Sequence, residues 1–470
     1  MEQNTQPADR TIQFAEDGII RLMYRYSLPS IVAMLTMMMF NLINMAFVGR
    51  SVGAPGIAAI AISMPLMMIQ GSISQLVGNG CAALVSITLG KGDREGSQGI
   101  LGCSLAVSLM VAGINMVLGF MFMTPLLRAF GASEAILPLA RDYMAISLFG
   151  MGFSAISTMN PILRIEGFPR QAMYTMLCST LLNFAFAPLF IFVFHMGIRG
   201  AALGSFCAQI GSASWIFLFL INKKRVVRLE WKFIRIRLRT IQEVMQLGLP
   251  TFLMQITQSL LSVVMNTSLG TYGGDIAISA WGVTNNINNV VAQPIFGLNQ
   301  GIQPIIGYNY GAKNYRRVKQ TLIYALTAAT IFSVVSWILI WLFPEPIIAF
   351  FNSDQELIRI GSRMLIIFRM CIFVVGFQQA GASYFQFCGQ PGKSIFLTIS
   401  RQVLILIPCI LILPRFFQLD GILYSGPVSD VVSTILTAFY VFAEVRRLNK
   451  LIAQTESEPK AEADTALDPA

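Results

Sequence analysis

The feature that most constrains this chain is a series of long apolar runs, each bounded by charged residues, glycine or proline. A helix needs about 20 apolar residues to cross a bilayer whose hydrocarbon core is ~30 Å thick. Runs of this length predict twelve spanning segments, at residues 27–48, 57–89, 98–122, 136–160, 171–194, 199–221, 246–269, 277–310, 321–342, 357–380, 394–413 and 421–443. The segments 57–89 and 277–310 are long enough that we expect them to tilt or bend.

Charged residues are too scarce for a soluble protein. They make up 12% of the 470 residues, against about 25% in ordinary soluble domains. A soluble chain cannot cover its surface with so few, so the composition indicates an all-α integral membrane protein. The polar residues 1–13 before the first run lead us to expect no cleaved signal peptide.

The formal charge of +10 is concentrated where it can report topology. Eight basic residues lie between the sixth and seventh apolar runs, and the other connections on that side are basic as well. Cytoplasmic loops carry an excess of Lys and Arg, so both termini are expected in the cytoplasm and the chain in the inner (cytoplasmic) membrane. This placement argues against a nucleic-acid partner and for contact with membrane lipid. The eight residues are Lys223, Lys224, Arg225, Arg228, Lys232, Arg235, Arg237 and Arg239.

The chain repeats itself after 221 positions. Leu28-Pro29-Ser30 falls on Leu249-Pro250-Thr251, and glycines coincide at 49 and 270, 53 and 274, 80 and 301, and 90 and 311. Glycine and proline mark backbone geometry, so the two halves are predicted to share a fold. Six spans per half predict two six-helix bundles related by a pseudo-two-fold axis along the membrane normal. The expected divisions are a cytoplasmic segment 1–26, an N-lobe 27–221, a basic linker 222–245, a C-lobe 246–443 and a disordered cytoplasmic tail 444–470.

Several motifs, taken in order, resemble the multidrug and toxic compound extrusion (MATE) family, in its MepA-like bacterial branch. They include Leu28-Pro29 with Asn44-Met45-Ala46-Phe47-Val48-Gly49, then Arg164-x-x-Gly167-x-Pro169, Gly301-Ile302-Gln303-Pro304 and Tyr308-Asn309-Tyr310-Gly311. The resemblance implies a V-shaped pair of bundles that exports amphipathic organic cations in exchange for H⁺ or Na⁺. It also implies that Pro29, and its repeat Pro250, act as hinges during alternating access.

The chain departs from that family's pattern at acidic positions. Many relatives carry an aspartate where Asn44 stands, and another where Ala187 stands. Asn183 and Ser205 match the remaining polar residues of the N-lobe cation site. A C-lobe glutamate found in another branch falls on Gln258. These departures leave the choice between H⁺ and Na⁺ as the coupling ion open.

Three ionisable residues lie inside apolar runs of the second half: Arg369, Arg401 and Asp430. A charge in the bilayer centre costs ~2.5–3.5 kcal/mol on insertion scales, so such a group needs a partner or a function. Asp430 is expected either to bind the coupling ion or a drug cation, or to neutralise one of the arginines.

Amides are concentrated in the eighth run. Asn285, Asn289 and Gln293 recur at intervals of four and so share one helix face, and Gln255 and Gln258 add to them from the seventh run. Amides are poor lipid-facing groups, so this face is expected to line a cavity or to hydrogen-bond another helix.

Enzyme signatures such as GxxxxGK[ST] and HExxH are absent from the sequence, and no Cys/His cluster has metal-ligand spacing. We therefore predict a monomeric secondary active multidrug transporter with no catalytic residue, metal or cofactor, coupled only to H⁺ or Na⁺. One alternative is a flippase for lipid-linked or other small molecules of the same superfamily. Another is a membrane enzyme or assembly factor, for which no catalytic constellation is found.

Overall fold

The structure is a computed structural model that describes residues 7–222, 224–351 and 354–465, and within those ranges every regular element is a helix. The first half contains α1 (Pro7–Glu16), α2 (Ile19–Val52), α3 (Ala54–Gly90), α4 (Arg94–Ala129), α5 (Leu137–Phe149), α6 (Met151–Ser157), α7 (Asn160–Ile165), α8 (Pro169–Pro188), η1 (Leu189–Val193) and α9 (Gly197–Leu220). The second half follows a short helix η2 (Trp231–Phe233). It contains α10 (Leu238–Gly311), α11 (Tyr315–Leu342), α12 (Pro344–Ala349), α13 (Gln355–Phe368), η3 (Ile372–Val374), α14 (Val375–Phe387), α15 (Pro391–Ile399), η4 (Ser400–Leu406), α16 (Ile407–Ile412) and α17 (Pro414–Thr465).

Eight of the described helices are long and apolar enough to cross a membrane, or ten if each of two bent pairs counts as one span. The bent pairs join Leu137–Phe149 to Met151–Ile165 at 47° and Gln355–Phe368 to Ile372–Phe387 at 48°. These findings confirm an all-helical membrane protein. The expected count of twelve would also include α2 and the part of α10 beyond Gly274; amide side chains lower the hydropathy of that α10 segment.

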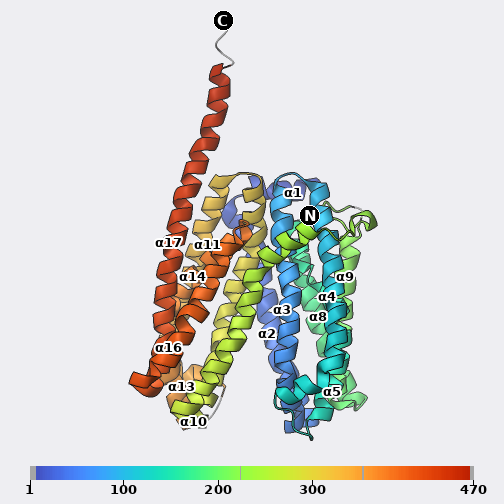
Figure 1. The fold of residues 1–470 in the computed structure, drawn as a ribbon, viewed down its shortest axis with the longest axis vertical. Helices are drawn as coiled ribbons and strands as arrows, with labels where there is room; N and C mark the ends of the chain where they lie inside the picture. The colour runs from blue at the N-terminus through green and yellow to red at the C-terminus, as the bar shows by residue number, and fades with distance from the viewer. Residues whose placement is uncertain (1–6, 223, 352–353, 466–470) are drawn as a thin grey trace.

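The two halves of the chain form two groups of helices that lie side by side. Helices α2 to α9 gather on one side and α10 to α17 on the other (Figure 1). The long helix α10 packs along α3 and α2, so it forms much of the contact between the groups. Helix α1 and the C-terminal end of α17 lie toward the same end of the molecule (Figure 1).

Unusual backbone conformations recur at the spacing of the sequence repeat. Gly53 has φ 74°, and Gly274, its match in the second half, has φ 69°. At the same spacing Gly197 (φ 56°) is followed by Gln418 (φ 52°), although only one of these two is glycine. The N-terminal caps of two helices also match: Asp93 and its match Asn314 each cap the following helix with a side-chain oxygen. The repeat therefore describes real backbone geometry.

The close contact between the groups is reciprocal. A Cβ on Gly90 would lie 2.0 Å from the carbonyl oxygen of Tyr308, and a Cβ on Gly311 would lie 2.0 Å from that of Ile87. In the repeat, Gly311 matches Gly90 and Tyr308 matches Ile87, so the two contacts are copies of each other. Only glycine fits such an approach of two backbones, which explains why these glycines are repeated.

The C-terminal residues differ from the expected disordered segment 444–470. Helix α17 continues to Thr465 and extends past the other helices (Figure 1). The residues of this extension include several Ala and Glu, which favour helix formation even without tertiary contacts. Composition alone predicts disorder for residues 444–470 because this segment is polar and charged.

Candidate functional site in the second half

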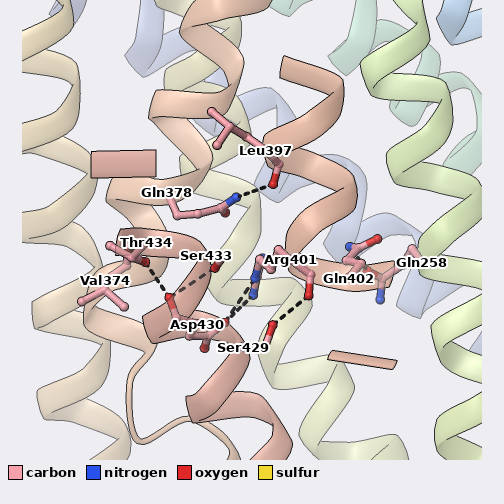
Figure 2. A network of polar contacts seen from close by, with 10 residues as sticks. All are labelled: Gln258, Val374, Gln378, Leu397, Arg401, Gln402, Ser429, Asp430, Ser433 and Thr434. Carbon is pink, nitrogen blue, oxygen red and sulfur yellow. Dashed lines mark hydrogen bonds and ion pairs between the residues drawn. The ribbon is translucent and has the colours of Figure 1, made fainter. Parts of the chain in front are cut away.

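Asp430 on α17 is a buried carboxylate, 3% exposed, and it pairs with Arg401. The Nη2 atom of Arg401 lies 3.0 Å from Oδ1 of Asp430, and its Nε donates to the same oxygen at 3.2 Å (Figure 2). The other carboxylate oxygen, Oδ2, has no partner among the described residues. Asp430 is therefore held on one side while one of its oxygens stays available to an ion or a proton.

An irregular helical turn sets the position of Arg401. It lies in η4, a π-helical stretch that interrupts the span between α15 and α16. Such stretches are rare and often occur at functional sites, because the wider turn changes the direction of the following side chains. The Ser429 hydroxyl donates to the Arg401 carbonyl oxygen at 2.8 Å, which fixes this turn against α17 (Figure 2).

Arg369 is the second cation of this cluster. It follows α13 at the bend before η3, is 5% exposed, and its guanidinium carbon lies 5.0 Å from the centre of the Phe368 ring. Arg369 and Asp430 interact electrostatically, although no hydrogen bond joins them in the described structure. Arg369, Arg401 and Asp430, which the sequence named as possible partners, thus form one cluster with two cations and one anion.

An amide network extends the cluster toward α10. The Gln402 side chain donates to Oε1 of Gln258 at 3.1 Å, and its own oxygen accepts a hydrogen bond from Thr257. Figure 2 shows Gln402 and Gln258 beside Arg401. Gln258 was expected to line a cavity, whereas Gln402 and Thr257 were missed. The position of Gln402 directly after Arg401 was the available signal, but sequence could not tell which way it points.

The remaining expected lining amides are found in different environments. Gln255 and Asn289 are exposed, whereas Asn285 and Gln293 are half-buried. Their side chains make no hydrogen bond within the part of the chain that the structure describes, so they are accessible to a ligand. Their role as cavity lining stays a prediction.

The N-lobe cation site that the family resemblance implies has only neutral side chains among its described residues. Asn183 on α8 is buried and donates to the Ser205 hydroxyl on α9 at 2.9 Å, while its own Oδ1 has no described partner. Ala187, where the family resemblance leads us to expect an aspartate, is 1% exposed and packs against Gly204. The Asn44 side chain lies outside the described residues. The structure brings Asn183 and Ser205 together, but neither residue titrates in the physiological range.

The two predicted hinges, Pro29 in α2 and Pro250 in α10, lie inside continuous helices. The residue after each proline contacts a side chain from a later helix of the same half. Arg164 lies 3.5 Å from the Ser30 hydroxyl, and Gln386 donates to the Thr251 hydroxyl at 3.2 Å. Sequence reasoning missed Arg164 and Gln386 as partners of the hinges. The repeat could have found them, because they precede the matching Gly167 and Gly389 by the same interval.

Comparison with known proteins identifies the family. A family model described as MatE matches residues 29–189 and again residues 250–412, so the two matches begin at the repeated prolines. The chain belongs to the MATE family. Curated MATE relatives include the multidrug export protein MepA of Staphylococcus haemolyticus (strain JCSC1435), 24% identical over 94% of this chain and 97% of the relative. MepA of Staphylococcus aureus (strain MSSA476) is also 24% identical, over 91% of this chain and 95% of its own.

Solved MATE structures share the fold. The multidrug transporter DinF-BH, solved in a complex with a small molecule, superposes with a TM-score of 0.84 at 33% identity, covering 90% of this chain and 95% of that one. A MATE crystal structure in the bent conformation gives a TM-score of 0.88 at 22% identity, covering 94% and 99%. MATE proteins are membrane transporters rather than enzymes and need no cofactor. Among the described residues, no group of three or more His, Cys, Asp and Glu side chains could hold a metal ion.

Proposed function

We propose that this MATE protein is a secondary active multidrug efflux transporter that exports amphipathic organic cations in exchange for H⁺ or Na⁺, by alternating access. One observation carries the proposal: Asp430 is buried, bound to Arg401 through one oxygen, and has a second oxygen without a described partner. A buried carboxylate of this kind can bind a proton or a cation and exchange it, whereas amides and hydroxyls cannot carry a proton at physiological pH.

The proposed architecture is twelve spans in two six-helix bundles, with a pseudo-two-fold axis along the membrane normal. The repeated backbone conformations and the reciprocal contacts of Gly90 and Gly311 support it. In a two-fold contact, residue i of one unit touches residue j of the other, and j touches i in return. We assign the bundles to residues 27–221 and 246–443, joined by the linker 222–245, and propose that the protein acts as a monomer.

Alternating access requires the two bundles to separate at one end. At the end that carries α1, they are now held together by Phe14, whose ring lies 5.2 Å from Tyr26 of α2 and 5.4 Å from Tyr308 of α10. Asn309 and Arg317 donate to the Phe14 carbonyl oxygen at 3.0 and 3.1 Å. These contacts join α1 to helices of both bundles, so opening this end would require them to break. They support a rocking motion with Pro29 and Pro250 as hinges.

The substrate class rests on the relatives, which are named multidrug export proteins. One observation favours the alternative, a flippase for lipid-linked or other small molecules. The buried cluster contains two arginines and one carboxylate, so it carries an excess positive charge that a phosphate-bearing substrate would neutralise.

The decisive experiment measures dye and ion movement in proteoliposomes. A cationic dye should accumulate when a H⁺ or a Na⁺ gradient is imposed separately, and the active gradient identifies the coupling ion. No dye movement under either gradient, together with transfer of a fluorescent lipid-linked phosphate between leaflets, would replace antiport with the flippase function.

The proposed orientation places both termini and the linker 222–245 in the cytoplasm. The basic connections support it, because anionic cytoplasmic leaflets and the insertion machinery favour Lys and Arg on that side. Single cysteines at positions 232 and 272 test it in intact cells. A membrane-impermeant thiol reagent should label position 272 and not position 232, and the reverse pattern would overturn the orientation.

A further inference from the structure

An open apolar groove of about 410 Å³ lies on α9, close to the end of that helix. It is lined by Gly211, Trp215, Leu218 and Phe219, whose spacing places them along one face of the helix. Trp215 is 40% exposed and Leu218 is 64% exposed. Because α9 is a candidate membrane span, such an exposed apolar face is in contact with lipid.

Gly211 lines the groove where α9 packs closely against α8. A Cβ at this position would lie only 2.3 Å from Cδ1 of Leu182 on α8, so a side chain here would fill the space between α8 and α9. From Gly211 to Phe219 the groove follows the helix for about 12 Å, at ~1.5 Å per residue. A narrow apolar channel along a spanning helix suits an acyl chain.

Positively charged side chains lie at the other end of the groove. The Arg225 guanidinium lies 4.0 Å from the centre of the Phe219 ring and 4.0 Å from that of Phe168, so it is stacked between the two rings. Lys224, next to it, is exposed, and so is Arg170 in the first turn of α8. A cation at the end of an apolar groove marks the level of the lipid headgroups.

The backbone that carries these cations is held in place. Glu166 accepts hydrogen bonds from the backbone N–H groups of Val226, at 3.3 Å, and of Val227, while Gln98 donates to the Val226 carbonyl oxygen at 2.9 Å. Glu166 also offsets part of the charge of Arg225. Because Lys224 and Arg170 add two further positive charges, this end of the groove stays cationic.

We propose that this groove binds an anionic phospholipid, with one acyl chain along Gly211, Trp215 and Leu218 and its phosphate against Lys224 and Arg225. A zwitterionic phospholipid fills the groove equally well, but its headgroup brings no net negative charge to the cations. The expected preference is about fivefold for each cation near the phosphate. The proposal concerns the lipid-facing side of the first half, so it does not depend on the coupling ion or on the exported substrate.

The test is native mass spectrometry of the purified full-length protein with dioleoyl-phosphatidylglycerol or dioleoyl-phosphatidylcholine. The parent protein should retain phosphatidylglycerol at least about fivefold more than phosphatidylcholine. Gly211→Leu should reduce retention of both lipids, and Lys224→Gln should reduce only the preference. Inorganic phosphate should not displace the lipid. Equal retention of both lipids by the parent protein would overturn the proposal.

Matched controls separate the site from general effects. Gly113→Leu makes the same change on α4, where a Cβ meets nothing within 4 Å, and Lys91→Gln removes an exposed cation elsewhere. Both should bind lipid like the parent protein, and a loss as large as at Gly211 or Lys224 would count against the site. If Gly211→Leu fails to fold, Leu218→Ser changes an exposed groove position instead and should also lower retention of both lipids.

Discussion

The two halves of this transporter repeat several backbone features but differ in chemistry. In the first half, Asn183 and Ser205 form a neutral pair at 2.9 Å, near the buried Ala187. In the second half, Asp430 pairs with Arg401 at 3.0 Å. A duplicated fold retains the glycines that set its backbone, whereas the side chains that face the interior can diverge in each copy. Coupling in this protein is therefore expected to depend on the second half alone.

A second comparison shows the same contact built in two ways. In the first half, Glu166, beyond the fourth span, accepts hydrogen bonds from Val226 and Val227, beyond the sixth. In the second half the glutamate lies on the other of the two segments, the one at the end of the last span. Glu444, 1% exposed near the end of the last span, binds Lys393 at 3.3 Å and Arg447 at 3.1 Å. Lys393 follows the fourth span of its half, just beyond Gly389, so in each half a buried glutamate joins the segment after the fourth span to the segment after the sixth, from opposite sides.

The largest effect is expected from Asp430→Asn, which keeps the size of the side chain and removes its charge. Gradient-driven export should be abolished, because no other buried carboxylate in this cluster can take up the coupling ion. The variant should still insert into the membrane and elute as a single species. Export of a cationic dye from proteoliposomes measures the effect, and transport at the parental rate would show that the second half does not carry the coupling.

Arg401→Gln tests the ionic pair from the other side. Removing Arg401 takes away both hydrogen bonds of the Asp430 carboxylate and leaves Arg369, which makes no hydrogen bond to it in the described structure, to offset its charge; breaking a buried pair costs up to ~3–5 kcal/mol. We expect a clear loss of thermal stability in detergent. The double variant Asp430→Asn with Arg401→Gln leaves Arg369 without a carboxylate in this cluster, so it should remain inactive and regain only part of that stability; a stable single variant would mean that the pair contributes little.

Glu166, in the first half, is expected to make the stability of the protein depend on pH. Burial raises the pKa of the Glu166 carboxyl to about 7 from its ordinary value of 4.5, against the lowering effect of its backbone hydrogen bonds and of Arg225. The folded protein therefore binds this proton more tightly than the unfolded chain does. Its contribution to stability is greatest below pH 4.5 and is lost as the pH rises through 7, by ~3 kcal/mol at most.

Thermal unfolding of the parent protein and of Glu166→Gln between pH 4.5 and 8 measures this contribution. The parent protein should lose more stability across that range than the variant, which cannot titrate at this position. Parallel curves for the two proteins would show that Glu166 takes up no proton on folding.

Pro29→Ala and Pro250→Ala compare the hinges of the two halves. Proline removes one backbone hydrogen bond and weakens the helix locally, so alanine should stiffen it and slow export several-fold without lowering the yield of folded protein. Equal losses would indicate that both bundles bend during transport. A loss at one proline only would assign the motion to that half, and unchanged transport in both variants would remove the prolines from the mechanism.

The smallest effect is expected from Ser205→Ala and Asn183→Ala. These side chains bond each other and do not titrate, so export under a H⁺ gradient should fall less than about twofold. Initial rates of dye export at matched protein density provide the measurement. A loss comparable to that of Asp430→Asn would return the coupling site to the first half.

The sequence by itself determined the membrane class, the internal repeat and the three ionisable residues of the second half. These follow from local properties: hydropathy over some twenty residues decides whether a segment enters the bilayer, and glycine and proline restrict the backbone wherever they occur. From the sequence, either Arg369 or Arg401 could pair with Asp430. Sequence alone does not decide between them, since both arginines lie far from Asp430 along the chain.

Tertiary structure decided which side chains meet. The π-helical turn at η4 sets the direction of Arg401 and Gln402, and no local propensity predicts where such a turn forms. In the same way, Arg164 approaches Ser30 and Glu166 approaches Val227 only because the packed helices bring distant segments together. Around a helix, a shift of one residue turns a side chain by about 100°. Contacts between spans therefore depend on how each helix is rotated in the packed protein, which its own sequence does not fix.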